Sequence, residues 1–216
     1  MMKKLLKFFL KRHSFSGSAH YWEERYQAGG HSGQGSYGRL QEFKRETLNH
    51  MISENSLSSA IEFGCGDGAQ LEGIRWPRYT GLDVSCKAVE LCRKKFESDS
   101  TKCFMTAGEY SGQKADASLS LDVLYHLVED SVYEAYMARL FAAGERFVII
   151  YSTDIDLDSG GDLHVRHRAF TDWISKNATS WGLVARIQNP YHPTDINRPL
   201  NGESAADFFI FRKLGA

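Results

Sequence analysis

The sequence has almost no net charge. Its 216 residues include 26 Lys and Arg against 27 Asp and Glu, which leaves a formal charge of −1 at pH 7. Attraction to nucleic acid usually needs a basic protein surface, so the charge balance gives no reason to expect a nucleic-acid partner. Hydrophobic residues make up 42% of the chain and aromatic residues 12%. A chain of this length and composition can bury one sizeable core, with no sign of a second domain.

Cysteines are few and scattered. The chain has four of them, at Cys65, Cys86, Cys92 and Cys103, and they do not form the closely spaced pairs of a zinc site. They fall in predicted strands, turns and helix faces. We therefore expect reduced, mostly buried thiols in a cytoplasmic protein and no metal centre.

A long apolar run is also missing at the N-terminus. Residues 1–12 mix Lys and Arg with Leu and Phe, whereas a spanning helix needs about 20 apolar residues and a secretory signal needs a longer apolar core with a small-residue cleavage site. One interpretation is a basic amphipathic helix on the inner face of a membrane or on a partner protein. The other is a frayed tail whose apolar residues pack on the domain.

The chain does contain a glycine-rich turn after a short apolar strand. Gly64, Gly66 and Gly68 follow Glu62 at alternate positions, and glycines let a backbone turn sharply and approach a ligand closely. Gly64 and Gly66 with Ala69 also satisfy the loose dinucleotide fingerprint. The glycines alone therefore leave an NAD-dependent oxidoreductase open beside other nucleoside-binding proteins.

The surroundings of the turn narrow the choice. Glu62 with the three glycines, and Asp83 at the end of the next apolar stretch, resemble the signatures of class I S-adenosylmethionine-dependent methyltransferases over about residues 58–150. The resemblance implies S-adenosylmethionine as cofactor, with Asp83 on the ribose hydroxyls, because a carboxylate accepts two charge-assisted hydrogen bonds. The cofactor-binding residues that we predict are Glu62, Gly64, Cys65, Gly66, Gly68, Asp83 and Asp122.

Strand and helix patterns alternate through the chain, as in a parallel sheet covered on both faces. Strands are expected at 102–107, 117–121 and 147–151, and helices at 38–54, 85–96 and 130–143. Ser85 is expected to cap the second helix, Asp130 and Ser131 the third, and Gly144 to end the third. Two β-rich runs, 183–187 and 207–212, match the terminal antiparallel hairpin of methyltransferases. The predicted fold is a Rossmann-like, seven-stranded, mostly parallel sheet with helices on both faces, and the hairpin argues against a dehydrogenase.

Residues 14–38 are rich in glycine, serine and aromatic residues. Five glycines lie between Gly29 and Gly38, which indicates a mobile loop. A lid over cofactor and acceptor is one interpretation, and a flexible linker is the other. The expected division is an N-terminal basic segment and lid at 1–37 and a methyltransferase domain at 38–216.

Two polar clusters are candidates for the acceptor site. Tyr125 and His126 follow the predicted fourth strand, where open α/β sheets bind ligands, and His126 could take a proton from a hydroxyl or only orient the loop. The second cluster, residues 164–168, could be a site for an anionic acceptor, a metal site or a solvated loop. Paired arginines recognise carboxylate and phosphate, which favours the anionic acceptor over a metal.

The sequence thus predicts a methyltransferase that methylates oxygen on a small or glycan-like, anionic acceptor. A non-catalytic cofactor-binding or scaffold protein with the same fold is the alternative. The predicted catalytic residues are His126, His164 and His167. The predicted substrate-binding residues are Tyr37, Tyr125, Arg166 and Arg168.

Overall fold

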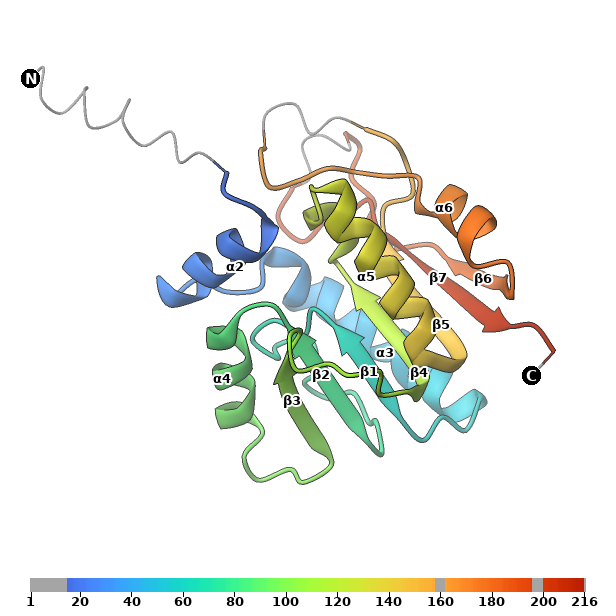
Figure 1. Ribbon diagram of the computed structural model, residues 1–216, viewed down its shortest axis with the longest axis horizontal. Helices are drawn as coiled ribbons and strands as arrows, with labels where there is room; N and C mark the ends of the chain where they lie inside the picture. Colours follow the sequence, from blue (N-terminus) through green and yellow to red (C-terminus); the bar gives the residue numbers. More distant parts are fainter. Residues whose placement is uncertain (1–14, 158–161, 196–199, 216) are drawn as a thin grey trace, which may run out of the picture.

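The computed structural model describes residues 15–157, 162–195 and 200–215. Seven strands within these residues form one sheet in the order β3-β2-β1-β4-β5-β7-β6 (Figure 1). The first five strands in this order are parallel, and β7 runs antiparallel to both of its neighbours. The strands are β1 (Ala60–Phe63), β2 (Tyr79–Asp83), β3 (Lys102–Thr106), β4 (Ala115–Leu121), β5 (Gly144–Ser152), β6 (Trp181–Ile187) and β7 (Asp207–Lys213). The predicted fold and its terminal hairpin are confirmed.

Helices cover both faces of the sheet. They are α2 (Ser18–Gln27), α3 (Gly38–Glu54), α4 (Cys86–Lys95), α5 (Asp130–Ala143) and α6 (Phe170–Asn177), with short 3-10 turns η1 (Gln34–Ser36) and η2 (Leu124–His126). Alternate side chains of a strand point to opposite faces. Accordingly, Ile149 of β5 packs in the cluster that contains Leu48 of α3, and Ile150 packs with Met137 of α5 on the other face.

The expected helices are present, but not every predicted cap is. The helix at 38–54 forms as α3, and the Ser85 hydroxyl caps α4 by accepting from the Ala88 amide at 3.0 Å. The capping box predicted for α5 is wrong: the N-cap residue is Glu129, with no side-chain cap, and the Asp130 carboxylate instead binds Arg166 and Arg168. Helix α5 ends at Ala143 with Gly144 as its C-cap, as predicted, but Gly144 is extended, with φ −76° and ψ 131°, and begins β5 instead of forming a left-handed cap.

Residues 14–38 contain a helix that we did not predict. Ser18–Gln27 forms α2, which lies beyond the carboxyl ends of β1 and β2 beside α4 (Figure 1). Ser18, Trp22 and Tyr26 are spaced four residues apart, so they lie on one face of this helix. That face is the one turned to the cavity described below.

Candidate active site

The glycine turn begins where β1 ends. Gly64, Gly66 and Gly68 have φ angles of +87°, +57° and +73°, a region that other residues rarely adopt. A Cβ atom on Gly64 would also lie 2.5 Å from the Val123 side chain. Backbone conformation and close packing therefore both require glycine at this turn.

Asp83 connects the turn to the next helix. One of its carboxylate oxygens accepts from the Gly66 amide and the other from the Ser85 amide, each at 2.9 Å. Burial raises the pKa of Asp83 to about 6, against these hydrogen bonds, which lower it. Each carboxylate oxygen retains acceptor capacity, and Asp83 lines the cavity at the carboxyl end of β2.

Glu62 lies beneath the turn and is only 3% exposed. The Tyr79 hydroxyl donates to it at 2.5 Å, and burial raises its pKa to about 7. Glu62 is thus a buried carboxyl group that lines the cavity and is hydrogen-bonded to Tyr79.

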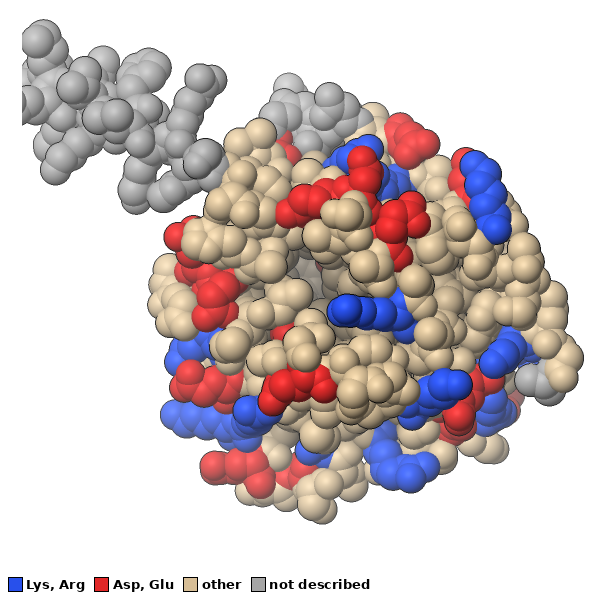
Figure 2. All heavy atoms as spheres, in the orientation of Figure 1, with Lys and Arg blue, Asp and Glu red and all other residues tan. Residues whose placement is uncertain are grey.

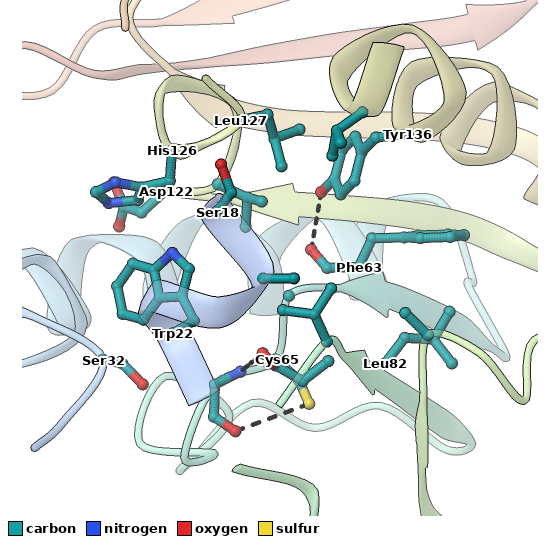
Figure 3. A pocket seen from close by; sticks show the side chains of 18 of the residues that line it. Ser18, Trp22, Ser32, Phe63, Cys65, Leu82, Asp122, His126, Leu127 and Tyr136 are labelled. Atoms are coloured by element: carbon teal, nitrogen blue, oxygen red, sulfur yellow. Dashed lines mark hydrogen bonds between the residues drawn. The ribbon is translucent and has the colours of Figure 1, made fainter. Parts of the chain in front are cut away.

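One cavity of about 610 Å³ connects this turn to α2, η2 and α5. In Figure 3, Trp22 projects from α2 into it, with His126 and Asp122 on one side and Cys65 on the other. Six of the seven predicted cofactor-binding residues line the cavity: Glu62, Gly64, Cys65, Gly66, Asp83 and Asp122. Gly68 does not, because it packs against α4 near Cys92 and Phe96.

Asp122 is held in a left-handed conformation, with φ +59°, at the end of β4. Lys44 of α3, whose side chain is fully buried, forms an ion pair with it. The Tyr125 hydroxyl donates to the other carboxylate oxygen at 2.8 Å. Tyr125 therefore supports Asp122 from behind and does not itself line the cavity.

Asp67, inside the glycine turn, binds the segment that follows α2. Its carboxylate accepts from the hydroxyls of Ser32 and Tyr37, each at 2.8 Å. Burial would raise the pKa of Asp67, but these bonds and the Ala69 amide outweigh it and lower that pKa. The Tyr37 side chain thus contacts the turn, and its predicted role in acceptor binding stays a prediction.

His126 is the one predicted catalytic histidine that lines the cavity. Its Nδ1 lies 3.1 Å from the His164 carbonyl oxygen. Because a carbonyl only accepts, Nδ1 carries the proton and Nε2 keeps a free lone pair. Burial lowers the pKa of His126 to about 4, so the ring is neutral near pH 7. The ring meets Trp22 edge-on, with centroids 4.9 Å apart.

The other predicted acceptor-site residues lie outside the cavity lining. The His164 ring stacks on Tyr21 at 4.4 Å, and His167 pairs with the Thr153 hydroxyl at 2.7 Å. Both Arg166 and Arg168 bind Asp130, and both donate to the Val128 carbonyl. These contacts attach the loop after β5 to residues 128–130, which follow His126 in the chain.

Several residues of the site were not predicted from the sequence, among them Ser18, Trp22, Tyr26, Lys44 and Glu129. The Glu129 carboxylate accepts from the Ser18 amide at 2.8 Å and from its hydroxyl at 2.6 Å, which fixes the start of α2. The spacing of Ser18, Trp22 and Tyr26 was a usable signal, because a helix would put all three on one face. For Glu129, the sequence held no comparable signal.

Two further features bear on the kind of site that the chain can form. Among the described residues, no group of three or more His, Cys, Asp and Glu side chains could hold a metal ion, and no helix is long and apolar enough to cross a membrane. Acidic and basic side chains alternate over the face seen in Figure 2. The N-terminal segment 1–12 lies outside the described residues.

Comparison with known proteins agrees with this geometry. Residues 61–149 match the family model of a methyltransferase domain. The N-methyltransferase NodS of Bradyrhizobium japonicum, solved with S-adenosylhomocysteine, has a similar structure, with a TM-score of 0.68 and 16% identity over 92% of this chain and 99% of that chain. A comparison of the sequence with curated proteins gives no match.

Two further solved structures share the fold. Magnesium protoporphyrin IX methyltransferase of Synechocystis, with bound S-adenosylhomocysteine, has a TM-score of 0.60 and 14% identity over 95% of this chain and 99% of that chain. An S-adenosylmethionine-dependent methyltransferase of Clostridium acetobutylicum has a TM-score of 0.59 and 12% identity over 92% and 98%. These solved structures, at 12–16% identity, show that the fold is shared. The chain therefore has the fold of the S-adenosylmethionine-dependent methyltransferases, and residues 61–149 match the family model of a methyltransferase domain.

Proposed function

We propose that the protein transfers the methyl group of S-adenosylmethionine to an oxygen atom of a small molecule bound beside His126. The observation that carries this proposal is the single cavity, which joins the glycine turn and Asp83 to the His126 ring. The similar structures support it, because NodS and the Synechocystis enzyme are both named as methyltransferases.

The cofactor end of the cavity fits S-adenosylmethionine. The backbone of Gly64 and Gly66 lines the cavity, and Asp83 lines it with acceptor capacity for the ribose hydroxyls. The lining includes the carboxylates of Glu62, Asp83 and Asp122, which suit a cationic ligand. When bound, the cofactor supplies a methyl group activated on a sulfonium.

His126 then has a defined task. Its free Nε2 lone pair accepts the proton of the acceptor hydroxyl as the oxygen forms its bond to the methyl carbon and the sulfur–carbon bond breaks. A ring with a pKa of about 4 is a weak base, so the proton moves late, once the attacking oxygen has become acidic. The proton afterwards passes to water.

The two arginines of the loop after β5 led us to expect an anionic acceptor, and their contacts in the fold do not support that expectation. Arg166 and Arg168 are engaged with Asp130 and lie outside the cavity lining. Within the described lining, Arg139 of α5 is the only Lys or Arg side chain. Glu129 remains ionised near His126, since bonds from Ser18 lower its pKa against the effect of burial. We therefore propose an uncharged or cationic acceptor over an anionic one.

A glycan-like acceptor, a cytoplasmic location and a membrane or partner contact through residues 1–12 stay part of the proposal without a structural observation behind them. Methylation of nitrogen is the second candidate, and NodS, which has a similar structure, is named as an N-methyltransferase. A neutral amine attacks through its own lone pair and needs no base, whereas a hydroxyl must give up its proton. The atom that carries the labelled methyl group in the product therefore distinguishes the two reactions.

Two measurements test the proposal. Calorimetry should show binding of S-adenosylhomocysteine and none of NAD, and Asp83→Asn should weaken that binding by about ten- to a hundredfold, because a charge-assisted bond is worth ~1.5–3 kcal/mol. Incubation of the protein with methyl-tritiated cofactor and the small-molecule ultrafiltrate of a cell extract should label a compound. Tight binding of S-adenosylhomocysteine with no labelled product from any extract would favour the non-catalytic alternative, and binding of NAD alone would favour the oxidoreductase.

A further inference from the structure

A second cavity, of about 160 Å³, lies where β5 ends and β7 begins. It shares no lining residue with the larger cavity that contains the glycine turn. A water molecule takes up about 30 Å³ in the liquid, so the space equals that of about five waters. The second cavity can therefore hold a small organic group but not a nucleoside cofactor.

Four strand residues form the floor of the second cavity, on the neighbouring strands β5, β7 and β6 (Figure 1). Ser152 of β5 lies opposite Asp207 of β7. Arg186 of β6 lies opposite Phe209 of β7. Opposite residues of antiparallel strands point to the same face of a sheet, as do residues two apart along one strand. All four side chains therefore share one face, on which Phe209 also meets Phe170 of α6, with ring centroids 5.0 Å apart.

Ser152 brings an unpartnered hydroxyl to this floor. The residue is only 1% exposed, and its Oγ has no hydrogen-bond partner within the part of the chain that the structure describes. Buried hydroxyls in native proteins almost always have a protein, water or ligand partner. Because Ser152 lines the second cavity, the molecule that fills this cavity can supply the missing bond.

Asp207, beside Ser152, is already fully bonded. One carboxylate oxygen accepts from the Asn189 amide at 2.9 Å and from Nε2 of His192 at 2.7 Å. The other accepts from Nε and Nη2 of Arg186 at 3.0 and 2.7 Å. A carboxylate has about four acceptor positions, and these bonds occupy them all. Asp207 therefore holds Arg186 and His192 in the cavity lining and does not itself bind a ligand.

The rest of the lining offers both donors and acceptors. Arg186, whose side chain is 59% exposed at the rim, has N–H groups beyond the two that Asp207 uses. His192 carries a proton on Nε2, because a carboxylate only accepts, and a neutral ring then accepts at Nδ1. Two carboxylates, those of Asp154 and Asp207, face one guanidinium. Even a protonated His192 would only balance these charges, so the lining does not favour an anion.

We propose that the second cavity binds the hydroxyl groups of an uncharged polyol or sugar. A hydroxyl both donates and accepts, which matches the Arg186 donors, the His192 acceptor and a Ser152 hydroxyl that can do either. Phe209 adds an apolar surface for the C–H groups of such a ligand. The site lies outside the cavity of the proposed function and does not depend on it.

Two probes distinguish the sources of such hydroxyls. Glycerol is a free polyol, and methyl β-D-glucopyranoside stands for a sugar unit of a larger molecule. In a titration of nitrogen-15-labelled protein, the amide resonances of Ser152, Thr153 and Ile155 should shift, and those of Gly64 and Gly66 should not. We expect affinities of about 1–10 mM, because a ligand with few atoms binds weakly. Tighter binding of the glucoside would indicate a sugar, and tighter binding of glycerol a free polyol.

Ser152→Ala removes the hydroxyl from the floor. Affinity for the tighter probe should fall about three- to tenfold, as expected for the loss of one neutral hydrogen bond. The melting temperature without ligand should equal or exceed that of the parent, because the variant removes a buried hydroxyl without a partner. Ser118→Ala is the matched control. Ser118 of β4 is also buried with an unpartnered Oγ, but it lines neither cavity, so this variant should leave the affinity unchanged.

Three results would overturn the proposal. Binding of inorganic phosphate in place of both probes would show that the second cavity is an anion site. No shift with either probe at about 100 mM would mean that water fills the cavity. An affinity that is unchanged in Ser152→Ala, or that falls equally in Ser118→Ala, would mean that the Ser152 hydroxyl does not contact the ligand.

Discussion

The two ends of the cavity are built in different ways. The end that we propose for the cofactor comes from one continuous stretch, in which β1, the glycine turn and the end of β2 place Glu62, Gly64 and Asp83 within 22 residues of sequence. The end that we propose for the acceptor is assembled from α2 and η2, with Trp22 and His126 meeting from positions 104 residues apart. Local sequence patterns can therefore indicate the first end, whereas the second depends on tertiary packing.

The largest effect should come from His126, which alone among the predicted catalytic histidines lines the cavity. His126→Phe keeps an aromatic ring but removes the proton acceptor, so methyl transfer to the labelled extract compound should fall by about 10²- to 10⁴-fold. Affinity for S-adenosylhomocysteine should stay nearly unchanged.

His164→Phe and His167→Phe serve as its controls. Both rings lie outside the lining, on Tyr21 and Thr153, and we expect smaller losses of rate from them. Losses as large as that of His126→Phe would instead make the whole cluster part of the chemistry, as the sequence alone predicts.

The next effect concerns Lys44, which forms an ion pair with Asp122 of the cavity lining. Lys44→Met leaves the partly buried Asp122 carboxylate without its cation, which should cost about 3–5 kcal/mol and lower the melting temperature by about 6–20 °C. Adding Asp122→Asn removes the stranded charge and should restore much of the loss, as a thermal melt of the double variant would show. Additive losses in the double variant would mean that the pair contributes little.

Lys44 also shows where sequence reasoning could have gone further. Leu40, Lys44 and Leu48 are spaced four residues apart, so a helix must bury the lysine with the leucines on one face. A buried cation needs an anionic partner. The spacing therefore indicates that Lys44 has such a partner, but it does not show that the partner is Asp122. The parallel sheet, α3 and the cofactor turn were predictable because their signals are local and periodic.

The acceptor end was less predictable for a physical reason. Arg166 and Arg168 carry the charge of an anion site, but Asp130, 36 residues before the first of them, forms ion pairs with both in the fold. Likewise the glycines at 29–38 indicated a loose loop, whereas hydrogen bonds to Asp67 attach this segment to the turn. The sequence shows which residues are charged and where the glycines lie. Which groups these residues contact depends on long-range contacts that the sequence does not show.

A smaller effect should appear in the pH dependence of stability. Burial raises the pKa of Glu62 from 4.5 to about 7, so between these values the folded state holds a proton that the unfolded chain has lost. The free energy of unfolding therefore falls as the pH rises from about 4.5 to 7, by up to about 3 kcal/mol from this group.

Glu62→Gln removes that titration. Urea unfolding at pH 5 and at pH 8 should show a smaller fall in stability for the variant than for the parent. Asp83, whose pKa is also raised, contributes with the same sign in both proteins, so the difference between the two proteins isolates Glu62. An identical pH dependence in the two would mean that Glu62 is ionised in the folded state.

The smallest effect tests whether the segment at 29–38 acts as a lid. Tyr37→Phe removes one hydrogen bond to Asp67 at a cost of about 1 kcal/mol, since the half-exposed site lets water replace the hydroxyl. If the segment must lift before the cofactor leaves, this loss should speed dissociation of S-adenosylhomocysteine by about fivefold in stopped-flow experiments. Amide exchange in residues 29–38 should rise with it. Tyr191→Phe, whose ring contacts Arg39 away from the turn, should change neither rate. Faster amide exchange without faster dissociation would show that the segment moves independently of cofactor release and is no lid.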